Sequence, residues 1–64
     1  MIVEAISRYL STNKIKQKDL AAQIGVSKQT ICTTLAGKRK LMVDEYVKIC
    51  DALKLNYSYF FANP

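Results

Sequence analysis

The sequence of 64 residues contains no histidine, and it has only one proline, two glycines and two cysteines. Without histidine the chain lacks the commonest general base near neutral pH. It also has no glycine-rich phosphate loop and no pair of carboxylates in a context that favours acid–base chemistry. We therefore expect this protein not to be an enzyme, and we expect no cofactor and no metal site.

Long apolar runs and cysteine frameworks are absent as well. No run of about 18 apolar residues is present, so no segment is expected to span a membrane. Cys32 and Cys50 fit neither a disulfide framework nor a metal-ligand spacing, which favours a reducing compartment. The first ten residues include the acidic Glu4 and no small-residue cleavage site, so we expect no signal peptide. The default expectation is a cytoplasmic protein.

The length allows one small domain, which we place at residues 1–64. A chain of this size buries only roughly 60% of its unfolded surface, and such domains often gain stability from a partner subunit. The apolar spacing predicts an all-α fold of five helices in a compact bundle. Apart from the central region described next, helices are expected at residues 2–12 and 43–53, with a short last one within 55–61.

The basic residues are concentrated in one region. The net charge is +5, but residues 14–40 hold seven lysines and arginines against Asp19 alone, a balance of +6. Residues 41–64 hold two lysines against three acids, a balance of −1. A basic face indicates a polyanionic partner such as nucleic acid. Charge alone leaves a solvated lysine-rich surface as the alternative.

Residues 17–37 read QKDLAAQIGVSKQTICTTLAG, and the rest of the chain is organised around them. A short helix opened by Gln17 leads to a turn at Gly25, which can adopt positive φ at little steric cost. Ser27 can then cap a second helix, from about Lys28 to Ala36, by accepting a backbone N–H bond. This order of residues predicts a helix-turn-helix at residues 17–36.

The second helix of this pair has two unlike faces at about 100° per residue. One face can bury Ile31 and Leu35. The opposite face presents polar groups suited to base edges: Gln29 can bond adenine, and Lys28 can donate to guanine. The candidate base-reading residues are Lys28, Gln29, Cys32 and Thr33. Each one alone could equally be an exposed helix residue.

The whole pattern resembles the phage Cro/repressor (Cro/C1-type) class of helix-turn-helix DNA-binding domains. The residues that carry the resemblance are Gln17, Leu20, Ala21, Ile24, Gly25, Val26, Ser27, Ile31 and Gly37, followed by Lys38, Arg39 and Lys40. The resemblance implies a sequence-specific transcriptional regulator of double-stranded DNA, acting as a dimeric repressor on a palindromic operator. It also implies that Gln17, Ser27 and Thr30 meet phosphate. The position of Lys38, Arg39 and Lys40 beside the second helix makes them further phosphate candidates.

Four positions depart from the family pattern, and one of them is Thr34, where an aliphatic residue is frequent. Lys16 stands where a capping serine or threonine is usual, which costs about 1 kcal/mol. Leu35 replaces a glutamate, so we expect an apolar contact with Leu10 in place of an ion pair. Lys54 replaces a glycine at the end of the helix at 43–53, and a left-handed lysine there would carry a modest penalty.

The last segment is rich in aromatic residues. It holds Tyr57, Tyr59, Phe60 and Phe61, too many for one face of so short an element. We expect Leu55 and Phe60 to point inward and Phe61 or Tyr57 to lie near a partner. The four aromatic residues together are the candidate dimer interface.

Two other functions stay open at this stage. One is a protein-interaction module, such as an antitoxin or anti-repressor, that uses the aromatic segment as its main binding surface. The other is a nonspecific nucleic-acid packing protein. Salt dependence would separate the first alternative from DNA binding, and competition with random DNA would separate the second.

Overall fold

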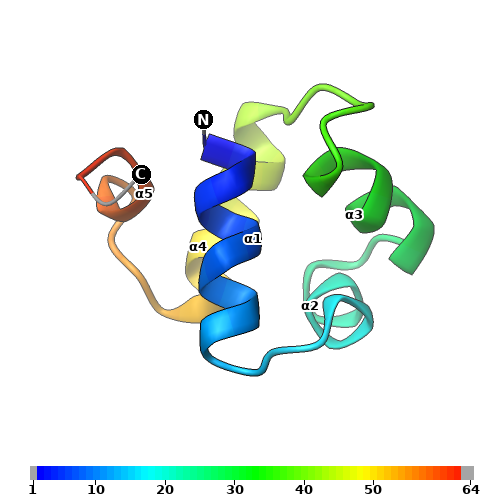
Figure 1. Ribbon diagram of the computed structural model, residues 1–64, viewed down its shortest axis with the longest axis horizontal. Coiled ribbons are helices and arrows are strands. Elements are labelled where there is room, and N and C mark those ends of the chain that lie inside the picture. The colour runs from blue at the N-terminus through cyan, green and yellow to red at the C-terminus, as the bar shows by residue number, and fades with distance from the viewer. Residues whose placement is uncertain (1, 63–64) are drawn as a thin grey trace.

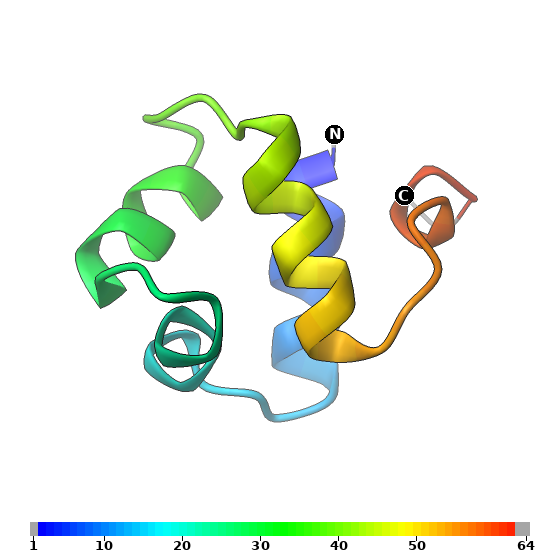
Figure 2. The same ribbon diagram turned by 180° about the vertical axis from the view of Figure 1, so that it is seen from behind.

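The computed structural model describes residues 2–62, and the rest of the predicted domain, Met1, Asn63 and Pro64, lies outside the described residues. The described chain forms five helices: α1 (Ile2–Thr12), α2 (Gln17–Ile24), α3 (Lys28–Leu35), α4 (Val43–Leu53) and α5 (Tyr59–Ala62). This confirms the all-α prediction. In Figures 1 and 2, α1 and α4 occupy the middle, with α2 and α3 on one side and α5 on the other. None of these helices is long and apolar enough to cross a membrane.

One core joins all five helices, because each of them contributes an apolar stripe or residue to it. Ile6 and Leu10 come from α1, and Ile49 and Cys50 from α4, as the spacing predicts. Leu35 lies in the same cluster as Leu10, which agrees with an apolar replacement for the expected ion pair. The full cluster is Ala5, Ile6, Leu10, Leu20, Ala21, Ile24, Ile31, Leu35, Ile49, Cys50 and Phe60.

The helical period places Val43, Tyr46, Val47, Ile49, Cys50 and Leu53 on one arc of α4, expected to face the core, but the start of this arc is not buried. Val43 is 81% exposed, although it shares the arc of Ile49 and Cys50. It is the first residue of α4, where the chain enters the helix from a loop and no other element covers it. The helical period alone therefore overestimated how far the buried stripe extends.

Helix ends follow the local chemistry of the sequence. Lys16 precedes α2 and makes no side-chain cap, as expected. At the end of α3, Gly37 has φ +81°, and the N–H groups of Gly37 and Lys38 donate to the carbonyls of Thr34 and Thr33, both at 3.1 Å. These two bonds form a Schellman motif, which ends α3 at Leu35, one residue earlier than predicted.

The end of α4 uses the same motif without glycine. Lys54 has φ +58°, so a lysine does occupy the left-handed position here. Its N–H donates to Asp51 O at 3.2 Å, and the next N–H, of Leu55, donates to Cys50 O at 2.9 Å. The bonds offset part of the cost of holding a lysine in this conformation.

Candidate nucleic-acid interface

Gly25 sets the angle between α2 and α3. Its φ is +80°, and its N–H and that of Val26 both donate to Ala21 O, at 2.9 and 3.0 Å. A Cβ on Gly25 would meet nothing within 4 Å, so the backbone conformation, and not crowding, favours glycine here. Ala21 is 1% exposed, and α2 packs against α3. Two short helices crossing over a small residue, with a tight turn between them, form a helix-turn-helix.

The start of α3 is fixed by a hydroxyl pair. Ser27 Oγ accepts the N–H of Thr30 at 3.1 Å, and it lies 2.9 Å from Thr30 Oγ1. The predicted N-cap at Ser27 is therefore confirmed. One of the two hydroxyls must donate to the other, so the pair keeps a single O–H proton for an outside acceptor such as a phosphate.

The outward face of α3 carries the residues expected to read bases. Lys28, Gln29 and Cys32 are exposed. Thr33 is half-buried, and its hydroxyl donates to Gln29 O at 2.8 Å. Since that proton is in use within the helix, Thr33 can offer a base only its oxygen lone pairs or its methyl group. Ile31 and Leu35 face the core, so α3 presents this polar face and no other.

Gln17 occupies the first position of α2 and is half-buried. It lies in the first turn of its helix, as Thr30 does in α3. Free N–H groups at helix starts are suited to phosphate oxygens. Thr30 differs from Gln17 in one respect: its N–H is already bonded to Ser27 Oγ, so its hydroxyl is the group left for the proposed phosphate contact.

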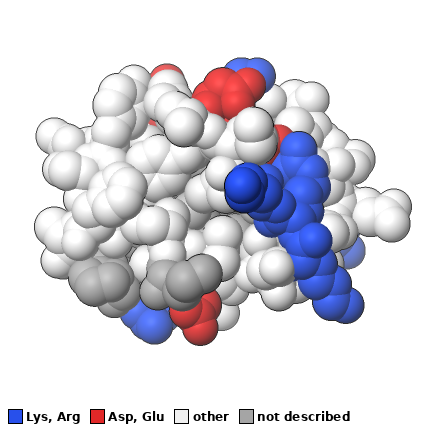
Figure 3. All heavy atoms as spheres, turned by 90° about the horizontal axis from the view of Figure 1, so that it is seen from above, with Lys and Arg blue, Asp and Glu red and all other residues white. Residues whose placement is uncertain are grey.

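The loop after α3 divides its three cations into two kinds. Lys38 and Lys40 are exposed, and Figure 3 shows lysine and arginine side chains as a band on the α3 side of the molecule. Arg39 is exposed as well, but it is paired: its Nη1 donates to Glu45 Oε1 at 2.9 Å and to Thr34 Oγ1 at 3.0 Å. We predicted a phosphate contact for Arg39, and the structure gives its guanidinium protein partners.

The partners of Arg39 are themselves fixed, so it ties α3 to α4. Thr34 is 2% exposed, and its hydroxyl donates to Thr30 O at 2.8 Å, which leaves its oxygen to accept from Arg39. Glu45 Oε1 also accepts the N–H of Met42 at 3.1 Å, next to the start of α4. We call Thr34, Arg39 and Glu45 the loop strut. It links the loop that carries Lys38 and Lys40 to both helices.

Pairing within the loop strut shifts the pKa values of Arg39 and Glu45. The hydrogen bond from Arg39 lowers the pKa of Glu45, with help from the Met42 N–H and against a smaller effect of burial. The same hydrogen bond from the other side raises the pKa of Arg39. Glu45 therefore keeps its charge to a lower pH than an ordinary glutamate.

The aromatic segment is split between core and surface. Phe60 is 0% exposed, with its ring 5.8 Å from Tyr9 and 6.3 Å from Tyr46, both nearly perpendicular. Its inward orientation is as expected, but it leaves Phe60 no surface for a partner, so its place in the predicted dimer interface was wrong. Tyr59 is half-buried, its ring 5.5 Å from that of Tyr9.

Two aromatic residues of the segment remain available at the surface. Tyr57 is 50% exposed and Phe61 is 67% exposed. Tyr57 is held in place: its hydroxyl donates to Asp51 Oδ1 at 2.9 Å, and its carbonyl accepts from the hydroxyl of Tyr46. A candidate interface is therefore limited to Tyr57, Phe61 and the edge of Tyr59.

The fold and this site together define a helix-turn-helix DNA-binding domain. Comparison with protein-family models matches the Cro/C1-type HTH DNA-binding domain over residues 5–58, which is most of the chain. The chain belongs to this family, and the resemblance inferred from the sequence is confirmed. Comparisons with curated proteins and with solved structures gave no significant match.

Proposed function

We propose that this protein is a sequence-specific transcriptional repressor that binds a palindromic operator as a dimer. The observation that carries the proposal is the outward face of α3, where Lys28, Gln29 and Thr33 are offered to solvent by a helix whose other face is buried. Inserted in the major groove, Gln29 would bond adenine and Lys28 would donate to guanine. Cys32 would pack against a thymine methyl group.

Phosphate contacts would hold α3 in register. Lys38 and Lys40 extend from the loop beside α3, and the Ser27–Thr30 hydroxyl pair and Gln17 stand at helix starts. These contacts add affinity on any sequence, whereas the base contacts add discrimination. One α3 reads only a few base pairs, so two copies on half-sites about 34 Å apart would supply the operator length. Repression would be steric, because the bound dimer would exclude polymerase from the DNA. The protein would act in the cytoplasm and would need no cofactor.

The experiment that tests this proposal is selection of bound duplexes from a random DNA pool. We expect enrichment of an inverted repeat whose half-sites are centred about 10 base pairs apart. Enrichment of a single half-site would contradict the dimer, and a pool that stays random would contradict base readout.

One observation favours a second candidate, a protein-interaction module. Met42, Val43, Tyr57 and Phe61 are large apolar residues left exposed at the surface. Affinity for DNA through several phosphates falls steeply with salt, but an apolar protein interface does not weaken in this way. A main partner bound equally well at low and high salt would favour this second function over DNA binding.

A further inference from the structure

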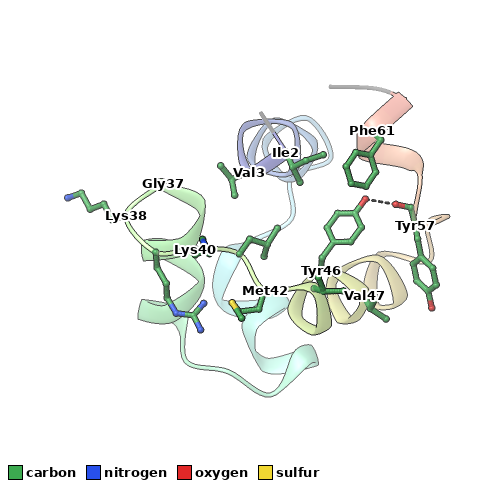
Figure 4. Close-up of a pocket in the computed structure, with 13 residues that line it drawn as sticks. Ile2, Val3, Gly37, Lys38, Lys40, Met42, Tyr46, Val47, Tyr57 and Phe61 are labelled. Atoms are coloured by element: carbon green, nitrogen blue, oxygen red, sulfur yellow. Dashed lines mark hydrogen bonds between the residues drawn. The ribbon is translucent and has the colours of Figure 1, made fainter.

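All the large apolar side chains that are strongly exposed in residues 2–62 line the same groove. They are Met42, Val43, Tyr57 and Phe61. The groove has a volume of about 930 Å³, and Figure 4 shows Ile2 and Val3 on α1, Tyr46 and Val47 on α4, and Phe61 on α5 around it. Scattered apolar residues on a surface need no explanation, but exposed ones collected in one concave site mark a place where something binds.

One end of the groove is basic. Lys38 and Lys40 belong to its lining, and neither has an acidic partner among the described ion pairs. Arg39 also lines it but is paired with Glu45 in the loop strut. Asp44 follows Val43 but lies outside the lining. An occupant that fits this groove therefore needs an apolar face and negative charge beside it.

We propose that the groove binds an acidic amphipathic helix of a protein partner, and that this partner competes with DNA. A helix is favoured because residues 2–62 form no strand whose edge an extended peptide could join. Apolar residues of the partner, spaced one helical turn apart, fill the groove. Acidic residues on the flank of the same helix meet Lys38 and Lys40.

A second copy of this chain is the occupant that the charges oppose. The chain carries ten cations and five acids. In residues 2–62 the strongly exposed large apolar residues all lie in the groove, so a second copy would have to dock there through its own groove. Two grooves facing one another would bring two basic loops together in the free protein. On DNA, phosphates would neutralise those lysines, so this surface can serve the proposed dimer there and an acidic partner elsewhere.

Competition with DNA follows from the shared lysines. Lys38 and Lys40 cannot meet phosphate and a carboxylate-bearing helix at the same time. The inference concerns regulation and rests on the groove, so peptide binding is measured first without DNA. Displacement from DNA is a separate measurement, and it alone depends on the proposed function.

The probe is a designed helical peptide of about 14 residues, which spans about 21 Å, close to the 22 Å width of the molecule. It carries leucine or phenylalanine at one-turn spacing and glutamate elsewhere, and a second peptide has lysine in place of every glutamate. Binding is followed by amide shifts of the isotope-labelled protein. Val43→Glu places a charge in the groove at an exposed helix start, where a carboxylate is tolerated. Gln23→Glu, at an exposed position of α2 outside the groove lining, is the matched control.

We expect the acidic peptide to shift the amides of Met42, Val43, Val47 and Phe61. Val43→Glu should weaken the affinity for the acidic peptide by about tenfold or more, because like charges at a docking site repel. Gln23→Glu should leave this affinity nearly unchanged. Equal binding of the lysine peptide, shifts located elsewhere, or no binding would overturn the proposal. So would concentration-dependent dimers of the free protein that Val43→Glu abolishes, because a second copy would then be the occupant. Circular dichroism confirms that each variant is folded. Peptide binding without displacement of DNA would refute the competition and leave DNA recognition intact.

Discussion

Neutralising the cations of the 38–40 loop should separate two effects that a run of basic residues usually combines. The variants are Lys38→Gln with Lys40→Gln, and Arg39→Gln alone. All three cations are exposed, but Arg39 also donates to Glu45 and Thr34, at 2.9 and 3.0 Å. We therefore expect the lysines to act on DNA affinity and Arg39 to act on the position and stability of the loop.

The size of the effect on DNA binding comes from counterion release. Removing one lysine that meets a phosphate should reduce the slope of log K against log salt by about 0.9, so the double lysine variant should reduce it by about 1.8. Arg39→Gln should leave this slope unchanged within error while it lowers the melting temperature. Glu45→Gln should lower the melting temperature too, and the combined variant should lose less than the sum, because both changes break the same pair.

The assay is fluorescence anisotropy of a labelled duplex titrated between about 50 and 200 mM salt, with thermal melts of the same samples by circular dichroism. A slope that falls by about 0.9 in Arg39→Gln, with an unchanged melting temperature, would show that Arg39 leaves the loop strut to bind phosphate. An unchanged slope in the double lysine variant would show that Lys38 and Lys40 are only solvated.

Three further predictions concern stability and assembly. Phe61→Asp should leave the helices folded, since Phe61 is 67% exposed, but should reduce cooperative binding to an operator with two half-sites. Analytical ultracentrifugation of the complex with that duplex measures this cooperativity, and an unchanged value would show that the dimer interface lies elsewhere. Because the folded state lowers the pKa of Glu45 from its ordinary 4.5, the stabilisation from its charge is present above about pH 4.5 and is lost as the pH falls below it. Melting temperatures measured down to about pH 3 should therefore fall less steeply in Glu45→Gln, and parallel curves would refute this assignment. Lys54→Gly should raise the free energy of unfolding by roughly 0.5–1 kcal/mol, because Lys54 has φ +58° and glycine removes the Cβ penalty. Urea denaturation that shows no gain would mean that the larger conformational entropy of glycine in the unfolded chain cancels that benefit.

The helix-turn-helix could be predicted from the sequence because its signals are local. Gly25, Ser27 and the spacing of Ile31 and Leu35 each act within one or two helical turns, and the structure reproduces all of them. The early end of α3 is a local effect as well, and the Gly37 and Lys38 N–H bonds account for it.

The parts that escaped prediction depend on contacts between distant elements or on very short ones. Nothing in the run Lys38-Arg39-Lys40 distinguishes its middle member until the fold brings Glu45 and the buried Thr34 hydroxyl to it. Phe60 was expected to point inward and does, but a helix as short as α5 has no measurable period, so the same residue was also counted in a surface that includes exposed Phe61. Val43 was misjudged because a helical stripe does not show where its cover ends.

Base readout by α3 is the central claim, and Gln29→Ala tests it most directly. Gln29 is exposed in the first turn of α3, and its removal leaves the buried face of the helix untouched. Affinity for the selected duplex and for a random duplex is measured at the same salt concentration. We predict a loss of about 1–3 kcal/mol on the selected duplex, relaxed preference at one base pair, and little change on random DNA. Equal losses on both duplexes would contradict the claim that this face of α3 reads sequence.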